Sequence, residues 1–250
     1  MDLRIQRYVV SNLRNRPQVV ESGPFVIGLD PDSDSPFINY ASPLPGEKIT
    51  AADVRALITA FTQAGRKPRL EYVTSGSPGL EDELIAAGFT VEARHQYLVS
   101  TPEKLCAFPV PPELHLAEPA TDPDRADLVV ALNEAFGEPP QASESDVARV
   151  RRTQERGGIA LAALTAAREC VGGAQAMAPN DQVSEVGGIG VREPFRRRGL
   201  AAAITASITD RLFRRGVEIA WLEAGGDDSW RVYERVGYVP TGHRLYISRG

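Results

Sequence analysis

Apolar residues in the C-terminal half of the chain recur at two different spacings. Leu128, Leu132 and Phe136 fall on every fourth position, which predicts an amphipathic helix over Asp122–Phe136. Shorter apolar runs predict strands. In chain order, the strands are expected at Glu113–Glu118, Ile159–Ala166, Val171–Ala178, Val183–Val191, Glu218–Glu223 and Tyr238–Ser248.

Residues typical of helix ends mark the remaining helices. These are expected at Glu144–Glu155, capped by Ser143 or Ser145, at Gly199–Arg215, closed by Gly216, and at Asp228–Val236, ended by Gly237. Pro179-Asn180 is expected to form the turn between the third and fourth strands. The resulting order, β-α-α-β-β-β-α-β-α-β, predicts a mixed central sheet flanked by helices, an α/β (α+β) fold.

The N-terminal half ends with a similar pattern. A helix over Ala51–Ala64 stops at Gly65, and the strand, glycine and final strand that follow match those of the C-terminal half: Arg69–Val73 with Glu218–Leu222, Gly88-Phe89 with Gly237-Tyr238, and His95–Ser100 with His243–Ser248. Gly65 and Gly88 are 23 residues apart, and the corresponding glycines are 21 apart. We interpret this as an internal duplication. The alternative is that any two αβαβ segments share such spacing.

A proline-rich segment separates the two halves. Four prolines lie within Pro102–Pro112, and proline removes backbone donors and fixes φ. We therefore expect a smaller related N-terminal α/β domain over residues 1–106, a linker over 107–112 and a second domain over 113–250.

Composition limits the range of partners. The chain of 250 residues has 42% hydrophobic and 24% charged residues and a net charge of −5. A mildly acidic chain is a poor partner for nucleic acid, which needs a clustered basic surface. The same charge tolerates a cationic substrate such as an amine.

The remaining bulk features predict a soluble cytoplasmic protein without a membrane partner. Cys106 and Cys170 lack ligand spacing and are expected to be free thiols in a reducing compartment. Met1–Arg7 does not resemble a signal peptide. The longest apolar stretch, near Ile159–Ala167, is about half the length that a membrane helix needs.

The loop before the long helix carries the clearest chemical signal. It contains three consecutive arginines, Arg196, Arg197 and Arg198, followed by Gly199, Leu200 and Ala201. A helix start offers unpaired N–H groups and positive potential, so a pyrophosphate fits there. The small residues allow the phosphates to approach the backbone, and the arginines add positive charge. The alternative is an ordinary exposed loop with a basic run. No metal-ligand cluster, Gly-x-Ser-x-Gly or GxGxxG motif is found in the sequence, and we expect no metal.

Three motifs in order resemble the GNAT superfamily of N-acetyltransferases over roughly Glu113–Ser248: Glu185-Val-Gly-Gly-Ile-Gly-Val191, Arg196-Arg-Arg-Gly-Leu-Ala201 and Tyr233-Glu-Arg-Val-Gly237-Tyr238. The resemblance implies acetyl-CoA as co-substrate, with its pyrophosphate on the second motif and its pantetheine arm along Ile189, Gly190 and Val191. It also implies that the sheet splays between this strand and Glu218–Glu223. The asparagine usual in the family seven residues before the tyrosine is replaced by Gly226, which puts one cofactor contact in doubt.

Acetyl transfer to an amine needs a base for the ammonium, a donor for the oxyanion and an acid for the leaving thiolate. The resemblance places Tyr233 beside the sulfur as the general acid; the alternative is an aromatic that only packs. Glu185 is the candidate base, because a carboxylate on a central strand is costly to bury without a role. An ion pair or an exposed glutamate is the alternative reading, and Glu223 is the competing base. A backbone N–H of Ile189–Val191 is expected to serve the oxyanion.

The corresponding loop of the N-terminal half, Ser42–Ala51, has two prolines and no arginine. A duplicated half would therefore have lost its cofactor site, as in tandem members of the family such as mycothiol synthases, which keep one weaker half. We expect an N-acetyltransferase that moves an acetyl group to a small-molecule or peptide amine by direct attack in a ternary complex. A non-catalytic CoA-binding or regulatory protein and a transferase of a longer acyl-CoA are the alternatives. The loop Gly137–Ser145 is expected to border the amine, and a homo-oligomer is left open.

Overall fold

The computed structural model describes residues 1–225 and 227–250, and these form two compact units. Unit 1 comprises Met1–Tyr97 and Pro240–Gly250, and unit 2 comprises Leu98–Val239. This division differs from the predicted one, because the end of the chain belongs to the N-terminal unit. The proline-rich segment at 107–112 lies inside unit 2.

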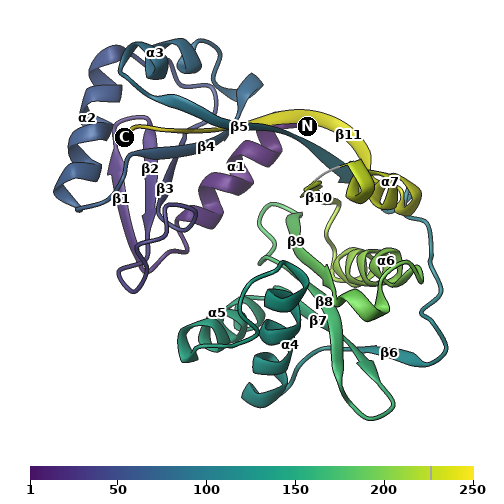
Figure 1. Cartoon of the computed structure of the whole chain (residues 1–250). Helices are drawn as coiled ribbons and strands as arrows, with labels where there is room; N and C mark the ends of the chain where they lie inside the picture. The colour runs from purple at the N-terminus through teal and green to yellow at the C-terminus, as the bar shows by residue number, and fades with distance from the viewer. Residues whose placement is uncertain (226) are drawn as a thin grey trace. The chain divides into compact units, whose positions relative to one another are not determined.

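Unit 2 contains a mixed sheet, as predicted. Its strands are β6 (Leu114–Ala117), β7 (Ile159–Thr165), β8 (Cys170–Ala176), β9 (Val183–Val191) and β10 (Ile219–Glu223). The order in the sheet is β10-β9-β8-β7-β6. Neighbours from β6 to β9 are antiparallel, whereas β9 and β10 are parallel. A parallel pair needs a crossover, which the helix between β9 and β10 provides (Figure 1).

Four helices of unit 2 follow the predicted ranges within a residue: α4 (Asp122–Ala135), α5 (Glu144–Glu155), α6 (Leu200–Arg214) and α7 (Asp227–Val236). Ser143 rather than Ser145 caps α5, through a capping box with Asp146. Thr121 caps α4 in the same way with Asp124. Each capping side chain satisfies N–H groups that the first helical turn leaves open.

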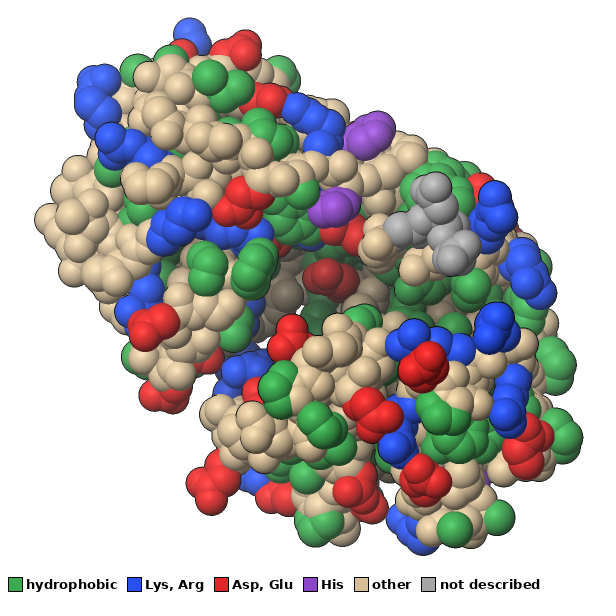
Figure 2. Space-filling model, in the orientation of Figure 1, with side chains coloured by type: hydrophobic (Ala, Val, Ile, Leu, Met, Phe, Trp, Pro, Cys, Tyr) green, Lys and Arg blue, Asp and Glu red, His purple; other side chains and the backbone are tan. Residues whose placement is uncertain are grey.

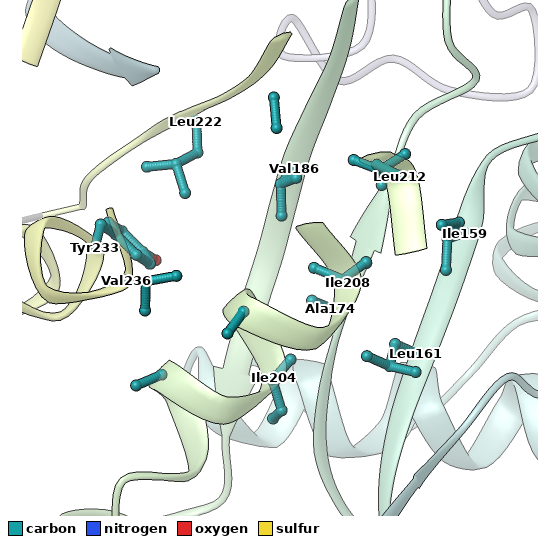
Figure 3. Close-up of a cluster of buried hydrophobic side chains, with 14 of the residues drawn as sticks. Ile159, Leu161, Ala174, Val186, Ile204, Ile208, Leu212, Leu222, Tyr233 and Val236 are labelled. Carbon is teal, nitrogen blue, oxygen red and sulfur yellow. The ribbon is translucent and has the colours of Figure 1, made fainter. Parts of the chain in front are cut away.

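The two faces of the sheet bury different helices, because successive side chains of a strand point to opposite sides. On β7, Ala160 and Ala162 belong to the core under α4 and α5. Ile159 and Leu161 belong to the core under α6 and α7. Figure 3 shows this second core, in which Ile204 and Ile208 of α6 lie against the strands.

The turn between β8 and β9 is not at Pro179-Asn180. Asn180 forms a bridge with Val183, so Asp181 and Gln182 are the two turn residues. Both have positive φ, at 48° and 58°. This is the backbone of a type I′ turn, whose twist matches that of the strands it joins. The predicted turn position is therefore wrong by two residues. Positive φ is usually a sign of glycine, and neither Asp181 nor Gln182 is one, so the sequence did not mark the turn.

In unit 1, five strands are consecutive neighbours in the sheet: β1 (Gln18–Ser22), β2 (Phe25–Leu29), β3 (Tyr40–Pro43), β4 (Arg69–Val73) and β11 (Val239–Ser248). Its helices are α1 (Asp2–Leu13), α2 (Ala51–Gln63) and α3 (Leu80–Ala86). β11 pairs antiparallel with β4 from Arg244↔Val73 to Ser248↔Arg69, which is why the chain end belongs to this unit. The strand β5 (Thr90–Ser100) crosses the division, and Leu98 lies in the core of unit 2.

Several bulk predictions can be compared with the structure. Both cysteines are free thiols, as predicted, and burial raises the pKa of Cys170 to about 11. Within the residues described, no helix is long and apolar enough to cross a membrane. Acidic and basic side chains are interspersed over the visible face of unit 2 (Figure 2), whereas a polyanion requires clustered basic residues.

Candidate active site

A cavity of about 510 Å³ lies within unit 2, between the end of α4, β9, the start of α6 and α7. Nine residues predicted from the sequence line it: Ile189, Gly190, Val191, Arg196, Arg197, Gly199, Leu200, Ala201 and Tyr233. Seven further residues line the cavity and were not predicted as site residues: Ala135, Phe136, Phe195, Ala202, Ser229, Val232 and Arg235. Two predicted residues, Arg198 and Glu185, are not part of the lining.

The start of α6 is the most distinctive wall of the cavity. Gly199 is its N-cap, has φ +77°, and provides no capping side chain. A Cβ at Gly199 would meet no protein atom within 4 Å, so the space beside it is open. The helices α4 and α5 carry side-chain caps, whereas the first N–H groups of α6 lack both an intrahelical acceptor and such a cap. Positive potential at this end favours an anion.

Arg196 holds the loop before α6 in place. Its Nε donates to the carbonyl of Val191 over 2.9 Å, and its Nη2 donates to the carbonyl of Ala135 over 2.7 Å. Arg197 follows with φ +60°, a conformation that is uncommon for a residue with a side chain. The loop is therefore shaped by side-chain bonds to the backbone as well as by Gly199.

Arg198 does not line the cavity and has protein partners of its own. Its Nη2 donates to the carbonyl of Pro194 over 3.0 Å, and its guanidinium lies 5.6 Å from the ring centroid of Phe195. A carboxylate oxygen of Glu113 is 3.9 Å away. The contact predicted between Arg198 and the phosphates stays a prediction.

β9 contains a bulge where it lines the cavity. Gly190 pairs with Gly173 and Gly187 pairs with Gln175, so β9 has one more residue than β8 in this interval. Gly188 supplies the required positive φ of +59°. A bulge interrupts the ladder and re-aims backbone groups, here next to Ile189 and Gly190. The adjacent Gly187 and Gly188 are a sequence signal that could have indicated the bulge, which was not predicted.

β9 and β10 part from each other, as the resemblance implied. Their parallel pairing runs from Ile219↔Val183 to Trp221↔Glu185. Both strands continue beyond these pairs, β9 as far as Val191. The segment of β9 beyond Glu185 is the one that lines the cavity. Among the described residues, β10 does not pair with β9 beyond Glu185. An extended ligand arm can therefore approach the backbone groups of β9 in this segment.

Tyr233 closes the α7 side of the cavity and is only 8% exposed. Figure 3 shows its side chain beside that of Val236, and both belong to the core that includes Val186 and Leu222. Its ring meets that of Tyr238 edge to face, with centroids 6.4 Å apart. The Tyr238 hydroxyl shares a buried hydrogen bond of 2.6 Å with Thr209 of α6. Burial raises the pKa of Tyr233 to about 12, so its phenol stays protonated at neutral pH.

Glu185 and Glu223 lie on the two strands that part. Glu185 is opposite Trp221 in the last pair of the ladder, and Glu223 is the last residue of β10. Both are partly buried. Neither lines the 510 Å³ cavity. The roles expected for these carboxylates stay predictions.

The apolar part of the cavity depends on close packing at Gly190. A Cβ at Gly190 would lie 3.0 Å from Ala135 Cβ and 3.0 Å from Leu132 Cδ2 of α4. Phe136, directly after α4, is 58% exposed and lines the cavity. A large exposed aromatic at the edge of a cavity offers an apolar contact for a bound molecule.

Together these features suit an elongated, anionic acyl carrier. The cavity combines an uncapped helix start and arginines with apolar walls, a bulged strand and a protonated phenol. These residues fit acetyl-CoA, which carries a pyrophosphate and an amide-containing arm that ends in a thioester. Within the parts of the chain that the structure describes, no group of three His, Cys, Asp or Glu side chains is placed to hold a metal ion.

Comparison with known proteins identifies the family to which the domain in unit 2 belongs. Residues 126–238 match the model of the acetyltransferase (GNAT) family, so unit 2 contains a GNAT acetyltransferase domain. Proteins of this family use acetyl-CoA as co-substrate and in general acetylate amines. No curated protein matches the chain.

Solved structures extend the likeness to the whole chain. A GCN5-related N-acetyltransferase from Kribbella flavida is 27% identical with a TM-score of 0.83, over 100% of this chain and 95% of that one. One from Sphaerobacter thermophilus is 17% identical with a TM-score of 0.66, over 97% and 84%. A tandem GNAT protein from the clavulanic acid biosynthesis pathway is 16% identical with a TM-score of 0.67, over 97% and 86%. The N-terminal half is therefore GNAT-like in fold as well.

One departure from the family pattern cannot be placed in this site. Gly226, which replaces the asparagine usual in the family, lies outside the described residues. The described part of α7 still contributes Ser229, Val232 and Tyr233 to the cavity.

Proposed function

We propose that this protein is an acetyl-CoA-dependent N-acetyltransferase that acts on a primary amine of a small molecule or a peptide. The observation that carries the proposal is the convergence on one cavity of the uncapped start of α6, the bulge of β9 and Tyr233. Each serves a different part of acetyl-CoA, and each is provided by a separate element of the same fold.

The start of α6 would hold the pyrophosphate. Arg197, Gly199 and Leu200 line the same cavity, and a helix start with open N–H groups suits a phosphate. The backbone of Ile189–Val191 would pair with the pantetheine arm as a neighbouring strand would. Arg196 keeps these two parts together, because it bonds to Val191 at the end of β9.

Acetyl-CoA supplies an activated acyl group, so the protein has to manage charge and protons. A backbone N–H at the bulge would stabilise the oxyanion, since a fixed dipole in a cavity needs little reorganisation. Glu185 would take a proton from the amine, directly or through water. Direct attack in a ternary complex requires no nucleophile from the protein.

Tyr233 would act on the leaving sulfur. Its pKa of about 12 exceeds that of an ordinary thiol, which is about 8.5. Complete proton transfer to the thiolate is therefore uphill by about three to four pKa units, or about 5 kcal/mol. A hydrogen bond donated to the developing thiolate is favourable from the start of bond cleavage, and this is the role we assign to the phenol.

The test compares two glycines at opposite ends of α6. Gly199 and Gly216 both have positive φ, at 77° and 87°, and a Cβ at either meets nothing within 4 Å. Gly199→Glu and Gly216→Glu therefore carry the same kind of backbone strain, but only the first places a carboxylate in the cavity. We expect calorimetry to show micromolar binding of acetyl-CoA to wild type and Gly216→Glu and none to Gly199→Glu.

A panel of amines, followed by release of free CoA thiol, then tests catalysis. Turnover that requires an added amine supports the transferase. Binding without turnover on any amine favours a CoA-binding regulatory protein, and absence of binding to wild type contradicts both.

A further inference from the structure

Unit 1 contains elements equivalent to the walls of the cavity in unit 2. β3, α2 and β4 follow one another as β9, α6 and β10 do. β3 and β4 are parallel and pair at Ala41↔Leu70, near the beginning of each strand. Their later residues part, as β9 and β10 do beyond Glu185 and Trp221.

The gap between β3 and β4 is filled by Gln6 of α1, whose side chain is completely buried. Its Nε2 donates to Ser42 Oγ over 2.8 Å and to the Pro43 carbonyl over 2.7 Å, at the end of β3. Its Oε1 accepts from the backbone N–H of Val73, at the end of β4, over 2.8 Å. One side-chain amide thus joins the ends of both strands.

The position of α1 explains how Gln6 reaches this gap. α1 packs across β2, β3 and β4, whereas α4 packs mainly on β8 and β9. The start of α1 is fixed by Asp2, which accepts hydrogen bonds from Ser75 and, over 2.6 Å, from the Tyr97 hydroxyl. Beyond Gln6, the backbone N–H of Gly46 donates to the carbonyl of Gly76 over 3.2 Å. This bond joins the segment after β3 to the one after β4.

The start of α2 is closed as well. Thr50 and Asp53 form a capping box, so side-chain oxygens already accept from N–H groups there. Asp53 Oδ2 accepts from the Thr50 hydroxyl over 2.6 Å, and this bond holds the pKa of Asp53 below its usual value. The negative carboxylate lies in the first turn of α2, the helix that corresponds to α6 in unit 2. An approaching anion would meet a like charge, and the N–H groups of Thr50 and Asp53 are already bonded.

We propose that the chain itself permanently occupies the unit 1 counterpart of the cofactor site, with Gln6 in place of the pantetheine arm and Asp53 in place of the phosphate, so that each chain binds one acetyl-CoA. The amide of Gln6 both donates to β3 and accepts from β4, which is the bonding capacity of an amide in pantetheine. Gln6 therefore connects the separated ends of β3 and β4, and unit 1 needs no ligand between these strands. The count of one rests on the proposed function of unit 2, whereas the closure by Gln6 does not.

The first experiment counts bound acetyl-CoA on the full chain by equilibrium dialysis with labelled acetyl-CoA. We expect one per chain in wild type and Gly216→Glu, and none in Gly199→Glu. Two per chain in wild type, or one remaining in Gly199→Glu, would overturn the proposal. If wild type binds no acetyl-CoA, the function proposed for unit 2 is contradicted. The second experiment then tests whether Gln6 closes the gap between β3 and β4.

The second experiment measures amide hydrogen exchange at Val73 without any ligand. Gln6→Met keeps the length of the side chain and removes the amide, so we expect Val73 to exchange about tenfold faster, from the loss of one buried hydrogen bond. Arg7→Met, at an exposed position of the same helix, is expected to leave the rate unchanged. An unchanged rate in Gln6→Met contradicts the closure. If Gln6→Met does not fold, the exchange rate of the Val73 amide in wild type is the test. A rate as fast as that of an exposed loop amide would overturn the proposal.

Discussion

The guanidinium of Arg196 donates to the carbonyl of Ala135 over 2.7 Å and thereby ties the loop before α6 to the last residue of α4. Carbonyls in the last turn of a helix have no intrahelical donor, and a cation there also complements the helix dipole. The next residue, Phe136, lines the cavity. One side chain therefore sets the distance between two walls of the cavity, beyond adding positive charge to it.

Replacing Arg196 by Met should weaken acetyl-CoA binding about tenfold, because two hydrogen bonds that pre-organise the loop are lost. Arg214→Met serves as the control, since Arg214 is exposed near the end of α6 and pairs with Asp210 over 2.9 Å. Calorimetry on both variants checks this. Equal affinities for the two variants would show that the bonds to Val191 and Ala135 do not organise the site.

Tyr233→Phe should lower kcat about 100-fold, the size typical of losing one hydrogen-bond donor to developing negative charge, while the KM for acetyl-CoA changes little. Since the pKa of Tyr233 is about 12, wild-type kcat should not decline through ionisation of this phenol below pH 10. Steady-state kinetics against pH with the amine found in the panel measure both. A KM effect without a kcat effect would assign Tyr233 to the wall of the cavity alone.

The two carboxylates on the parting strands can be separated by a matched pair of variants. Glu185→Gln should lower kcat about 100-fold, whereas Glu223→Gln should leave it within about threefold. Both substitutions keep the size of the side chain, and acetyl-CoA affinity should not change in either. The reverse pattern would make Glu223 the base, and normal activity in both variants would assign proton removal to another group.

Local patterns in the sequence predicted local structure well. β9 at Val183–Val191 and α5 at Glu144–Glu155 match the expected ranges, because periodicity and capping act within a few residues. The pairing of β11 with β4 was missed, since a ladder between strands far apart in the chain leaves no periodic signal. No helix or strand was predicted for the first 50 residues, where α1 and β1 to β3 are found.

In the candidate site too, features set by local sequence were predicted and contacts between distant segments were not. Gly199 and Tyr233 were predicted because a helix start and a spaced motif can be read directly. The acceptors of Arg196 and the closure by Gln6 depend on carbonyls and strands brought together by the fold. Such contacts become visible only once the sheet is assembled.

Close packing of α4 on the sheet makes Gly173 a sensitive position. A Cβ there would lie 2.3 Å from the Leu161 carbonyl oxygen and 2.4 Å from Leu128 Cδ1. Gly173→Ala should therefore cost about 3 kcal/mol and lower Tm by about 6–12 °C. Gly187→Ala is the control, because its Cβ meets nothing within 4 Å. Thermal unfolding followed by circular dichroism measures both, and equal Tm values would contradict the packing described.

Alkaline pH should destabilise the protein through its buried phenols. Burial raises the pKa of Tyr233 from 10.0 to about 12, so the folded state holds this proton more tightly than the unfolded chain does. The contribution is fully present below pH 10 and is lost as the pH rises toward 12, at up to about 1.4 kcal/mol per pH unit. Phenylalanine has no proton to lose, so the unfolding free energy of Tyr233→Phe should fall less steeply above pH 10 than that of wild type. Urea unfolding at pH 8, 9, 10 and 10.5 tests this, and parallel curves for the two proteins would place the Tyr233 hydroxyl in water. The pKa values of Tyr238, Tyr72 and Tyr97 are raised by burial too, and these phenols contribute to the loss of stability expected to remain in the variant.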